Sequence, residues 1–151
     1  MSGPFGNVYA ERTVLVTGHT GFKGSWLSVW LKQLGADVVG YSLDPPTTPS
    51  NFEVCHLSER ITDVRGDVRD YAALQACIAQ HRPSVVFHLA AQPIVLTGYE
   101  EPRETFETNV TGTINLLEAV RCTPGVQAVV CVTTDKVYAN REWTWGYREI
   151  D

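Results

Sequence analysis

The chain has 151 residues, and its 12 Lys and Arg against 17 Asp and Glu give a formal net charge of -5. A surface of this charge repels a phosphate backbone, so we expect no nucleic-acid partner. No stretch approaches the roughly 20 apolar residues of a membrane span, and the N-terminal MSGPFGNVYAERT lacks the apolar run of a signal peptide. The four cysteines form no Cys-x-x-Cys pair, so we expect reduced thiols in a cytoplasmic protein that does not bind membranes.

Apolar runs and helical patterns alternate along the first half of the chain. The segment 12–18, RTVLVTG, is a β-branched run ended by glycine, which predicts a strand. A helix is predicted over 23–35, where apolar residues recur at helical spacing and Gly35 stands at the helix end. Those apolar residues are Trp26, Leu27, Trp30, Leu31 and Leu34. The segments expected next are a strand over 37–43, a loop over 45–50 and a weaker strand over 61–67.

The second half of the chain continues this alternation. The segments expected there are a helix over 71–81, a buried strand over 84–91, a long helix over 102–121 and a fifth strand over 127–134. The long helix is predicted to be amphipathic, because its apolar residues recur every three or four positions. They are Phe106, Val110, Ile114, Leu117 and Val120.

Strands that are apolar on both faces and alternate with helices indicate a parallel sheet covered by helices on both sides. Because crossover connections are right-handed, the leading arrangement is a doubly wound parallel sheet of Rossmann type, an α/β fold with strands one to five present. The chain has no repeat, low-complexity segment or linker, so residues 1–151 are interpreted as one domain.

Three glycines, Gly18, Gly21 and Gly24, stand three residues apart in TGHTGFKG, between the first strand and the first helix. A dinucleotide-binding turn uses such residues to leave the strand sharply, to approach a pyrophosphate closely and to pack the helix tightly. The N–H groups at the start of the helix then face the anion. The spacing is Gly-x-x-Gly-x-x-Gly and not Gly-x-Gly-x-x-Gly, and a tight turn of purely structural importance is the alternative.

Acidic residues end the second and third predicted strands. Asp44 lies 20 residues after Gly24, where a dinucleotide-binding fold places the carboxylate that accepts from the adenosine ribose. No Arg occurs between positions 45 and 59 to receive a 2′-phosphate, which favours NAD over NADP. Asp67, in RGDV, is a candidate to receive the adenine amine. The structural alternatives are a turn residue before two prolines for Asp44 and the cap of the helix at 71 for Asp67.

Five motifs together resemble the landmarks of the extended short-chain dehydrogenase/reductases. In chain order they are VTGHTGFKG, GDVRD, FHLAAQ, ETNVTGT and VTTDKVY. Within that family, the segments HTGFKGSWL, HLAAQPIV and TTDKVYANREWTWGYRE are similar to the nucleotide-sugar 4,6-dehydratases that act on CDP-glucose. The resemblance covers nearly the whole chain after about residue 12. The glycine loop is shared by many enzymes of nucleotide sugars, whereas Asp-Lys after Thr134, followed by EWTWGYRE, is much more specific.

The resemblance implies that NAD is the cofactor and that separate segments of the chain hold it. The residues implied are Gly18, Thr20, Gly21, Phe22, Lys23, Gly24, Asp44, Asp67, Val68, Leu89, Ala90, Ala91, Thr108 and Val132. Of these, Thr108 and Val132 are expected near the ribose and nicotinamide. His88 precedes Leu89 in an apolar strand, and we interpret it as a core residue whose hydrogen bonds are satisfied rather than as a site residue.

The reaction implied by the resemblance oxidises C4 of the hexose, removes water across C5–C6 and returns hydride to C6. Elimination needs an acid for the C6 hydroxyl and a base for the C5 proton. The candidate catalytic residues are Thr134, Asp135 and Lys136, at the carboxyl end of the fifth strand. Asp135 is the candidate acid, while Lys136 is either the base or a cation that stabilises the enolate. A charged pair that merely ends the strand is the structural alternative.

Members of this family also use a Tyr-x-x-x-Lys motif, and none is correctly placed in this sequence. We therefore expect residues 1–151 to be a NAD-binding domain that is incomplete at its C-terminus and inactive alone, with the substrate domain elsewhere. The resemblance further implies a nucleotide-activated hexose, CDP-glucose, as substrate and a homo-oligomeric whole protein. The alternatives are another nucleotide-sugar dehydratase, a 4-epimerase and, from a different class, a non-catalytic NAD-binding module.

Overall fold

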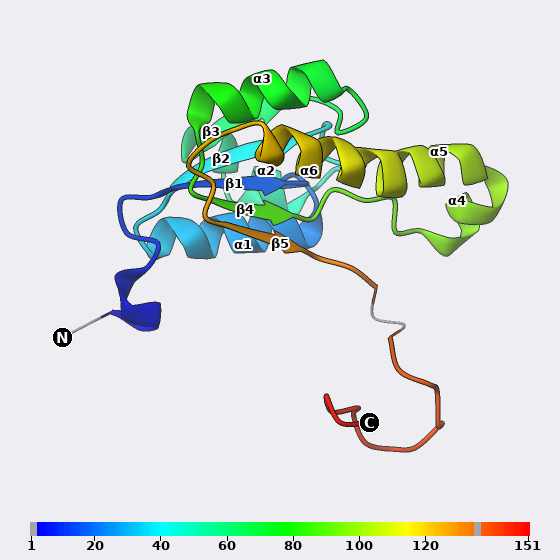
Figure 1. Ribbon diagram of the computed structural model, residues 1–151. Helices are drawn as coiled ribbons and strands as arrows, with labels where there is room; N and C mark the ends of the chain where they lie inside the picture. Colours follow the sequence, from blue (N-terminus) through cyan, green and yellow to red (C-terminus); the bar gives the residue numbers. More distant parts are fainter. Residues whose placement is uncertain (1–2, 135–136) are drawn as a thin grey trace.

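The computed structural model describes residues 3–134 and 137–151, which contain one sheet of five parallel strands (Figure 1). The strands lie in the order β3-β2-β1-β4-β5. Their bounds are β1 Thr13–Thr17, β2 Asp37–Ser42, β3 Thr62–Arg65, β4 Val85–His88 and β5 Ala128–Cys131. The order reverses between β1 and β4, which is the switch point of a doubly wound sheet. The predicted fold class is confirmed.

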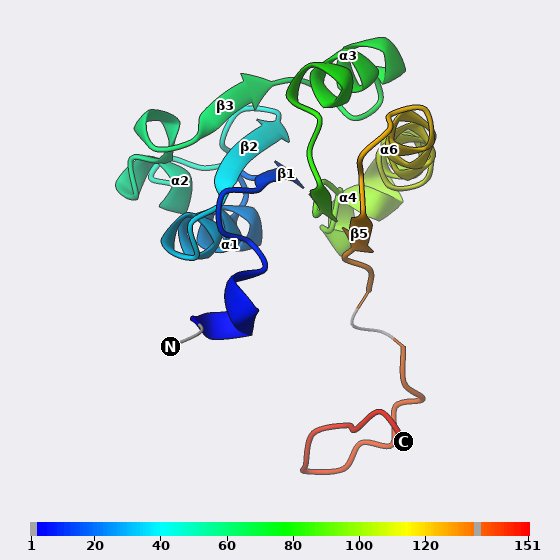
Figure 2. The ribbon, with the colours of Figure 1, turned by 60° about the vertical axis from the view of Figure 1, so that its left-hand side comes forward.

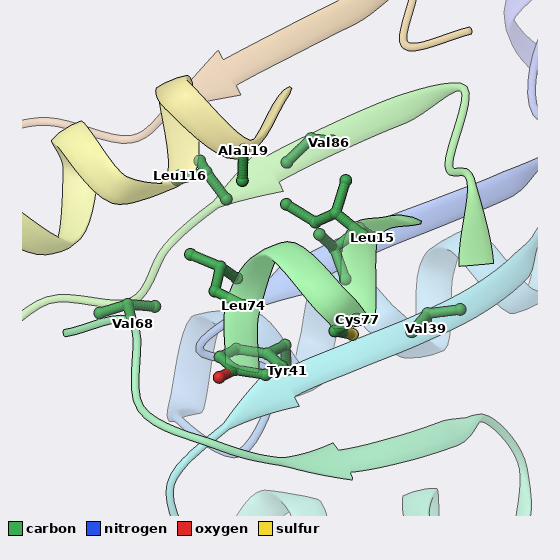
Figure 3. Close-up of a cluster of buried hydrophobic side chains, with 10 residues drawn as sticks. Leu15, Val39, Tyr41, Val68, Leu74, Cys77, Val86, Leu116 and Ala119 are labelled. Carbon is green, nitrogen blue, oxygen red and sulfur yellow. The ribbon is translucent and has the colours of Figure 1, made fainter. Parts of the chain in front are cut away.

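Helices cover both faces of the sheet, as Figure 2 shows. Their bounds are α1 Phe22–Gln33, α2 Asn51–Val54, α3 Tyr71–His81, α4 Val95–Glu100, α5 Pro102–Phe106 and α6 Gly112–Arg121, with a π-helical segment at Glu107–Thr111 and short turns at Pro4–Asn7 and Leu57–Glu59. Alternate residues of β1 face opposite layers. Val14 and Val16 pack with Leu31 of α1, whereas Leu15 packs with Leu74 of α3 in the second core cluster (Figure 3).

The long helix predicted over 102–121 is confirmed in extent, but it consists of α5, the π-helical segment and α6. Its expected apolar face is largely exposed: Phe106, Val110, Ile114 and Leu117 are 67%, 48%, 58% and 46% exposed. The side of α6 that packs against the core carries Leu116 and Ala119, both 0% exposed. The apolar spacing thus located the helix correctly. It assigned most of the buried face wrongly, because apolar residues stand both on the side that faces the core and on the side next to it.

Other differences from the sequence predictions concern short segments. The strands predicted over 84–91 and 127–134 end at His88 and Cys131, because pairing with the neighbouring strand stops there. Helix α4 was not predicted. Residues 137–151 contain no helix or strand and lie away from the sheet in Figures 1 and 2, with the rings of Tyr138 and Tyr147 stacked at 5.3 Å. Within the described ranges, no helix has both the length and the apolar character needed to cross a membrane.

Candidate functional site

A groove of about 750 Å³ runs along the carboxyl ends of the strands, at the switch point between β1 and β4. Every residue that the sequence proposed for cofactor binding lines it. These residues come from the glycine loop, the ends of β2 and β3, the segment after β4, the π-helical segment and the end of β5. The lining residues that sequence reasoning missed are Ser42, Leu43, Pro46, Gly66, Arg69, Gln92, Pro93, Ile94, Thr97, Glu104 and Thr133.

Two of the three loop glycines are required by contacts within the protein. A Cβ on Gly24 would lie 2.0 Å from the carbonyl oxygen of Gly18. Gly18 has φ +74, and a Cβ there would lie 2.8 Å from the backbone nitrogen of Ala90. The loop therefore packs against its own helix on one side and against the segment after β4 on the other. Gly21 differs, since its Cβ would meet only the Gly18 oxygen, at 3.4 Å, and its open side is the groove.

Helix α1 begins at the groove without a side-chain cap. Its N-cap is Gly21, and the first turn contains no acidic residue. Phe22, Lys23 and Gly24 form this first turn and line the groove. The first N–H groups of an α-helix have no partner within the helix, and they carry partial positive charge. This end of the groove is therefore suited to an anion such as a phosphate group.

Thr20 fastens the glycine loop to the end of β2. Its Oγ1 donates to the carbonyl oxygen of Leu43 at 3.0 Å and lies 2.8 Å from Oγ of Ser42. Because the carbonyl only accepts, the Thr20 hydroxyl hydrogen goes to Leu43, and the Ser42 hydroxyl donates to Thr20. The side chain is buried, at 4% exposure. Thr20 is thus a structural support of the groove as well as part of its wall.

Asp67 lies in the turn that follows β3, where its carboxylate is held by its own neighbour. Oδ1 accepts from the backbone N–H of Arg69 at 2.8 Å, and Oδ2 accepts from Nε and Nη2 of Arg69 at 2.9 and 2.6 Å. These bonds from Arg69 lower the pKa of Asp67. The alternative that Asp67 caps the following helix is wrong, because Asp70 accepts from the Ala73 N–H at 3.0 Å and caps α3. The Asn115 amide fixes the same turn by donating to the carbonyls of residues 68 and 69.

His88 sits at the end of β4 in a relay that is satisfied at both ring nitrogens, as the sequence predicted. The Thr17 hydroxyl accepts from the N–H groups of Leu89 and Ala90, each at 3.2 Å, so it donates to Nδ1 of His88 at 2.7 Å. Nε2 therefore carries the ring hydrogen and donates to the hydroxyl of Thr113 at 3.1 Å. Burial lowers the pKa of His88, which favours this neutral form.

The segment after β4 is also tied to the π-helical segment. The Gln92 N–H donates to Oδ1 of Asn109 at 2.8 Å, and Nδ2 of Asn109 donates back to the Gln92 carbonyl at 3.0 Å. This reciprocal pair places Thr108 beside the backbone of residues 89–91 in the groove wall. Sequence reasoning missed Asn109, and the only signal was its position in the ETNVTGT motif.

His19, inside the glycine loop, is fully buried beside Gly40 of β2 and Asp63 of β3. Its Nε2 lies 2.8 Å from Oδ1 of Asp63, and since a carboxylate only accepts, Nε2 carries the hydrogen. The ring contacts Phe52 edge to face, at 5.4 Å between ring centroids, and occupies the space that a Cβ on Gly40 would fill. Burial lowers the pKa of His19, although the bond to Asp63 opposes this shift.

The candidate catalytic segment begins where β5 ends. Val132 and Thr133 line the groove, and Thr134 follows them in exposed, irregular structure. Asp135 and Lys136 lie outside the described residues, so their proposed roles rest on the sequence. The structure therefore brings the start of this segment to the groove.

The comparisons with known proteins agree with this geometry. Residues 15–145 match the family model described as GDP-mannose 4,6 dehydratase. The chain belongs to this family. It is 54% identical over 143 residues to CDP-glucose 4,6-dehydratase of Salmonella typhimurium, which confirms the resemblance to dehydratases that act on CDP-glucose. That alignment covers 95% of this chain and 40% of the relative, so the chain spans less than half of the relative's length.

Epimerases are also among the similar proteins. CDP-paratose 2-epimerase of Salmonella typhi is 33% identical over 91% of this chain and 41% of its own length. Among solved structures, UDP-glucose 4-epimerase of Stenotrophomonas maltophila has a TM-score of 0.74 at 31% identity, over 88% of this chain and 40% of that chain. That structure contains NAD and formylated UDP-arabinopyranose.

Proposed function

We propose that the whole protein is a NAD-dependent nucleotide-sugar 4,6-dehydratase that acts on CDP-glucose, and that this chain forms its cofactor-binding domain. The observation that carries the proposal is the groove, where the residues expected to bind a dinucleotide gather from separate segments of the chain. The choice of CDP-glucose is supported by the 54% identity to the Salmonella typhimurium enzyme.

The groove has the features that a dinucleotide requires. The uncapped start of α1 offers N–H groups to the pyrophosphate, and the open side of Gly21 leaves room for it. Asp44 is assigned to the adenosine ribose, and the turn at Asp67 and Val68 to the adenine. At the opposite side, the backbone of residues 89–91 is assigned to the cofactor, with Thr108 and Val132 near the nicotinamide.

When bound, NAD accepts hydride from C4 of the hexose and supplies it again at C6. The protein itself must manage the loss of water across C5–C6. We assign Asp135 as the acid for the departing C6 hydroxyl and Lys136 as the base for the C5 proton or the cation that stabilises the enolate. Thr134 is assigned a hydrogen bond to the C4 oxygen, which makes it important for the oxidation step.

Calorimetric titration of the whole protein with NAD tests the cofactor assignment. We expect saturable binding, because the groove combines a helix N-terminus with carboxylates at the ends of two strands. Weaker binding in Gly21→Ala, which places a methyl group at the groove without a close contact inside the protein, locates it in the groove. A whole protein that binds no NAD contradicts the proposal.

The substrate is tested by turnover of CDP-, dTDP-, UDP- and GDP-glucose under identical conditions. We expect CDP-glucose to be converted most efficiently into a 4-keto-6-deoxy sugar. A preference for dTDP-glucose contradicts the substrate assignment while leaving the reaction class intact. A 4-epimerase is the second candidate, because a similar solved structure is a UDP-glucose 4-epimerase. A product that keeps its C6 hydroxyl with inverted C4 favours that candidate.

Single-turnover absorbance measurements separate the roles at the end of β5. In Asp135→Asn and Lys136→Ala we expect elimination to slow by about 10²–10⁴-fold, the usual contribution of general acid–base catalysis. Oxidation at C4 is expected to slow far less, so the reduced cofactor accumulates. Thr134→Val is the contrast, since slower oxidation should prevent that accumulation. If the Asp135 and Lys136 variants instead slow the first absorbance rise, the pair does not serve elimination.

A further inference from the structure

Arg65, the last residue of β3, brings a positive charge to the end of β2. In the parallel register Arg65 stands opposite Ser42, so its side chain reaches the residues that follow Ser42. Nη1 donates to the carbonyl oxygen of Leu43 at 3.1 Å and to Oδ1 of Asp44 at 3.4 Å. A guanidinium thus lies beside the carboxylate that lines the groove, although the two residues are 21 positions apart in sequence.

This guanidinium is fixed by groups other than Asp44. Nη2 of Arg65 donates to Oδ2 of Asp63 at 2.8 Å, and the Phe52 ring lies 4.9 Å from the guanidinium carbon. The other carboxylate oxygen of Asp63 is held by the buried His19. The Arg65 side chain is 35% exposed, whereas that of Asp44 is 92% exposed. The cation is therefore the anchored member of the pair, and the Asp44 carboxylate is the solvent-exposed one.

Resting on the proposed NAD-binding function, we propose that Arg65 determines dinucleotide specificity together with Asp44. In the natural pair, Arg65 steadies the Asp44 carboxylate at the groove wall, where the carboxylate accepts from the ribose of NAD and repels a 2′-phosphate. When the charge of Asp44 is removed, the same guanidinium becomes an attachment point for the 2′-phosphate of NADP. Although no arginine occurs between positions 45 and 59, an arginine from the neighbouring strand, Arg65, lies beside Asp44.

Simple charge counting supports this division of roles. One guanidinium stands between two carboxylates, Asp63 and Asp44, so the cluster carries one excess negative charge. Without the Asp44 charge, Arg65 and Asp63 balance, and the Nη1 side of the guanidinium loses its ionic partner. Phosphate oxygens are strong acceptors for arginine, and a charge-assisted hydrogen bond changes affinity by about tenfold or more.

The test measures NAD and NADP affinities by calorimetry for four forms of the whole protein: the natural protein, Asp44→Asn, Arg65→Gln and the double variant. We expect the natural protein to prefer NAD, and Asp44→Asn to bind NADP about tenfold more tightly than the natural protein does. The double variant should lose that gain. Arg65→Gln should weaken NAD binding by about threefold to tenfold, because Asp44 loses its partner.

Two controls separate charge from folding. Asp44→Asn/Arg65→Lys keeps the charge and should keep most of the NADP gain. Arg60→Gln removes an arginine that contacts the Cys55 carbonyl, outside the groove lining, and should change neither affinity. Should the Arg65 variants unfold, Asp44→Asn alone decides the question. Its NADP affinity must then fall more steeply with added salt than its NAD affinity, because the extra contact is ionic.

The role of Arg65 is overturned if Asp44→Asn binds NADP equally well with and without Arg65. It is also overturned if the NADP and NAD affinities of Asp44→Asn fall equally with added salt. In that case NAD binding by the natural protein still supports the proposed function. If the natural protein binds neither dinucleotide, the proposed function fails and the specificity role fails with it.

Discussion

The two halves of the groove are built differently. The β1–β3 half consists of the glycine loop and the ends of β2 and β3, and the β4–β5 half consists of the segment after β4, the π-helical segment and the end of β5. In the strands β1 and β2 that carry the first half, Val14, Val16 and Val39 are at most 3% exposed, and polar side chains fix the loop to the neighbouring strands. In the second half, β5 has no buried residue, and Val130 and Val132 are 45% and 47% exposed.

The two halves differ in the roles assigned to them: the first binds the phosphates and adenosine of the cofactor, and the second carries the reaction. The β1–β3 half, to which the phosphates and adenosine are assigned, is completed by contacts among residues of this chain. The β4–β5 half, to which the nicotinamide and the elimination chemistry are assigned, keeps apolar surface exposed at its edge strand. In the 151-residue chain, local stability should therefore fall from β2 to β5.

Substitution of Gly24 should have the largest effect on stability, because a side chain there would collide with the backbone in the β1–β3 half. A Cβ there would lie 2.0 Å from the Gly18 carbonyl oxygen. We expect Gly24→Ala to lower the free energy of unfolding by about 3 kcal/mol or more, since the gain in helix propensity is only about 1 kcal/mol. Thermal or urea unfolding measures the loss.

Gly21→Ala is the matched control for that change. Gly21 has φ -73, which any residue adopts, and its Cβ would make one ordinary contact at 3.4 Å. We expect a stability change within about 0.5 kcal/mol. Equal losses for the two variants would show that the loop is generally intolerant and that the Gly18–Gly24 contact has no special importance.

A pair of identical substitutions on two strands compares the halves directly. Val39 of β2 is 3% exposed and Val130 of β5 is 45% exposed. Val39→Ala should cost about 2 kcal/mol of unfolding free energy, because it removes two buried methyl groups and leaves a cavity, whereas Val130→Ala should cost less than about 1 kcal/mol. Hydrogen exchange should show β5 amides exchanging before those of β2. The reverse order would refute the proposed gradient of stability.

The last expected effect is a pH dependence of stability that arises from His88, at the end of β4. Burial lowers the pKa of His88 in the folded protein below 6.5, its ordinary value. The unfolded chain therefore binds a proton more readily, so the contribution of His88 to stability is present above pH 6.5 and is lost as the pH falls toward the lowered pKa. We expect His88→Asn, which keeps an acceptor for the Thr17 hydroxyl, to flatten this slope.

The difference between the natural protein and His88→Asn in the slope of unfolding free energy against pH gives the contribution of His88. This difference should reach at most about 1.4 kcal/mol per pH unit, the linkage of one proton. His19 remains in both proteins and carries the same sign, so some acid sensitivity should persist in the variant. Identical slopes for the natural protein and His88→Asn would mean that His88 does not resist protonation in the folded state.

Apolar spacing and capping residues in the sequence predicted the positions of the regular helices and strands. Helix α3 matches its predicted range, 71–81, because its apolar spacing is regular and Asp70 supplies a cap at its start. The strands of the sheet were predicted at the right places, but the ends of β4 and β5 were not. Apolar composition continues through Leu89 and Val132, where the backbone has already left the sheet and lines the groove.

Contacts between distant segments could not be predicted in this way. The approach of Arg65 to Asp44 depends on the register of β2 against β3, and the relay from Thr17 through His88 depends on the pairing of β1 with β4. Helix α4, at Val95–Glu100, is too short for periodicity to reveal it. The resemblance to a family located the groove residues well, and their roles in binding remain predictions, as do those of Asp135 and Lys136.

The π-helical segment Glu107–Thr111 makes the long helix two helices in different rotational phase. Each residue turns an α-helix by about 100°, and a π turn contains one residue more than an α turn. The buried face of α6, with Leu116, is thereby set independently of the groove face, with Glu104 and Thr108. Deletion of one residue between 107 and 111 would turn the π turn into an α turn and leave both faces in place, whereas a one-residue deletion in an unbroken α-helix would rotate one face by about 100°. The π turn therefore absorbs one extra residue in the sequence while the groove wall and the core keep their relative positions.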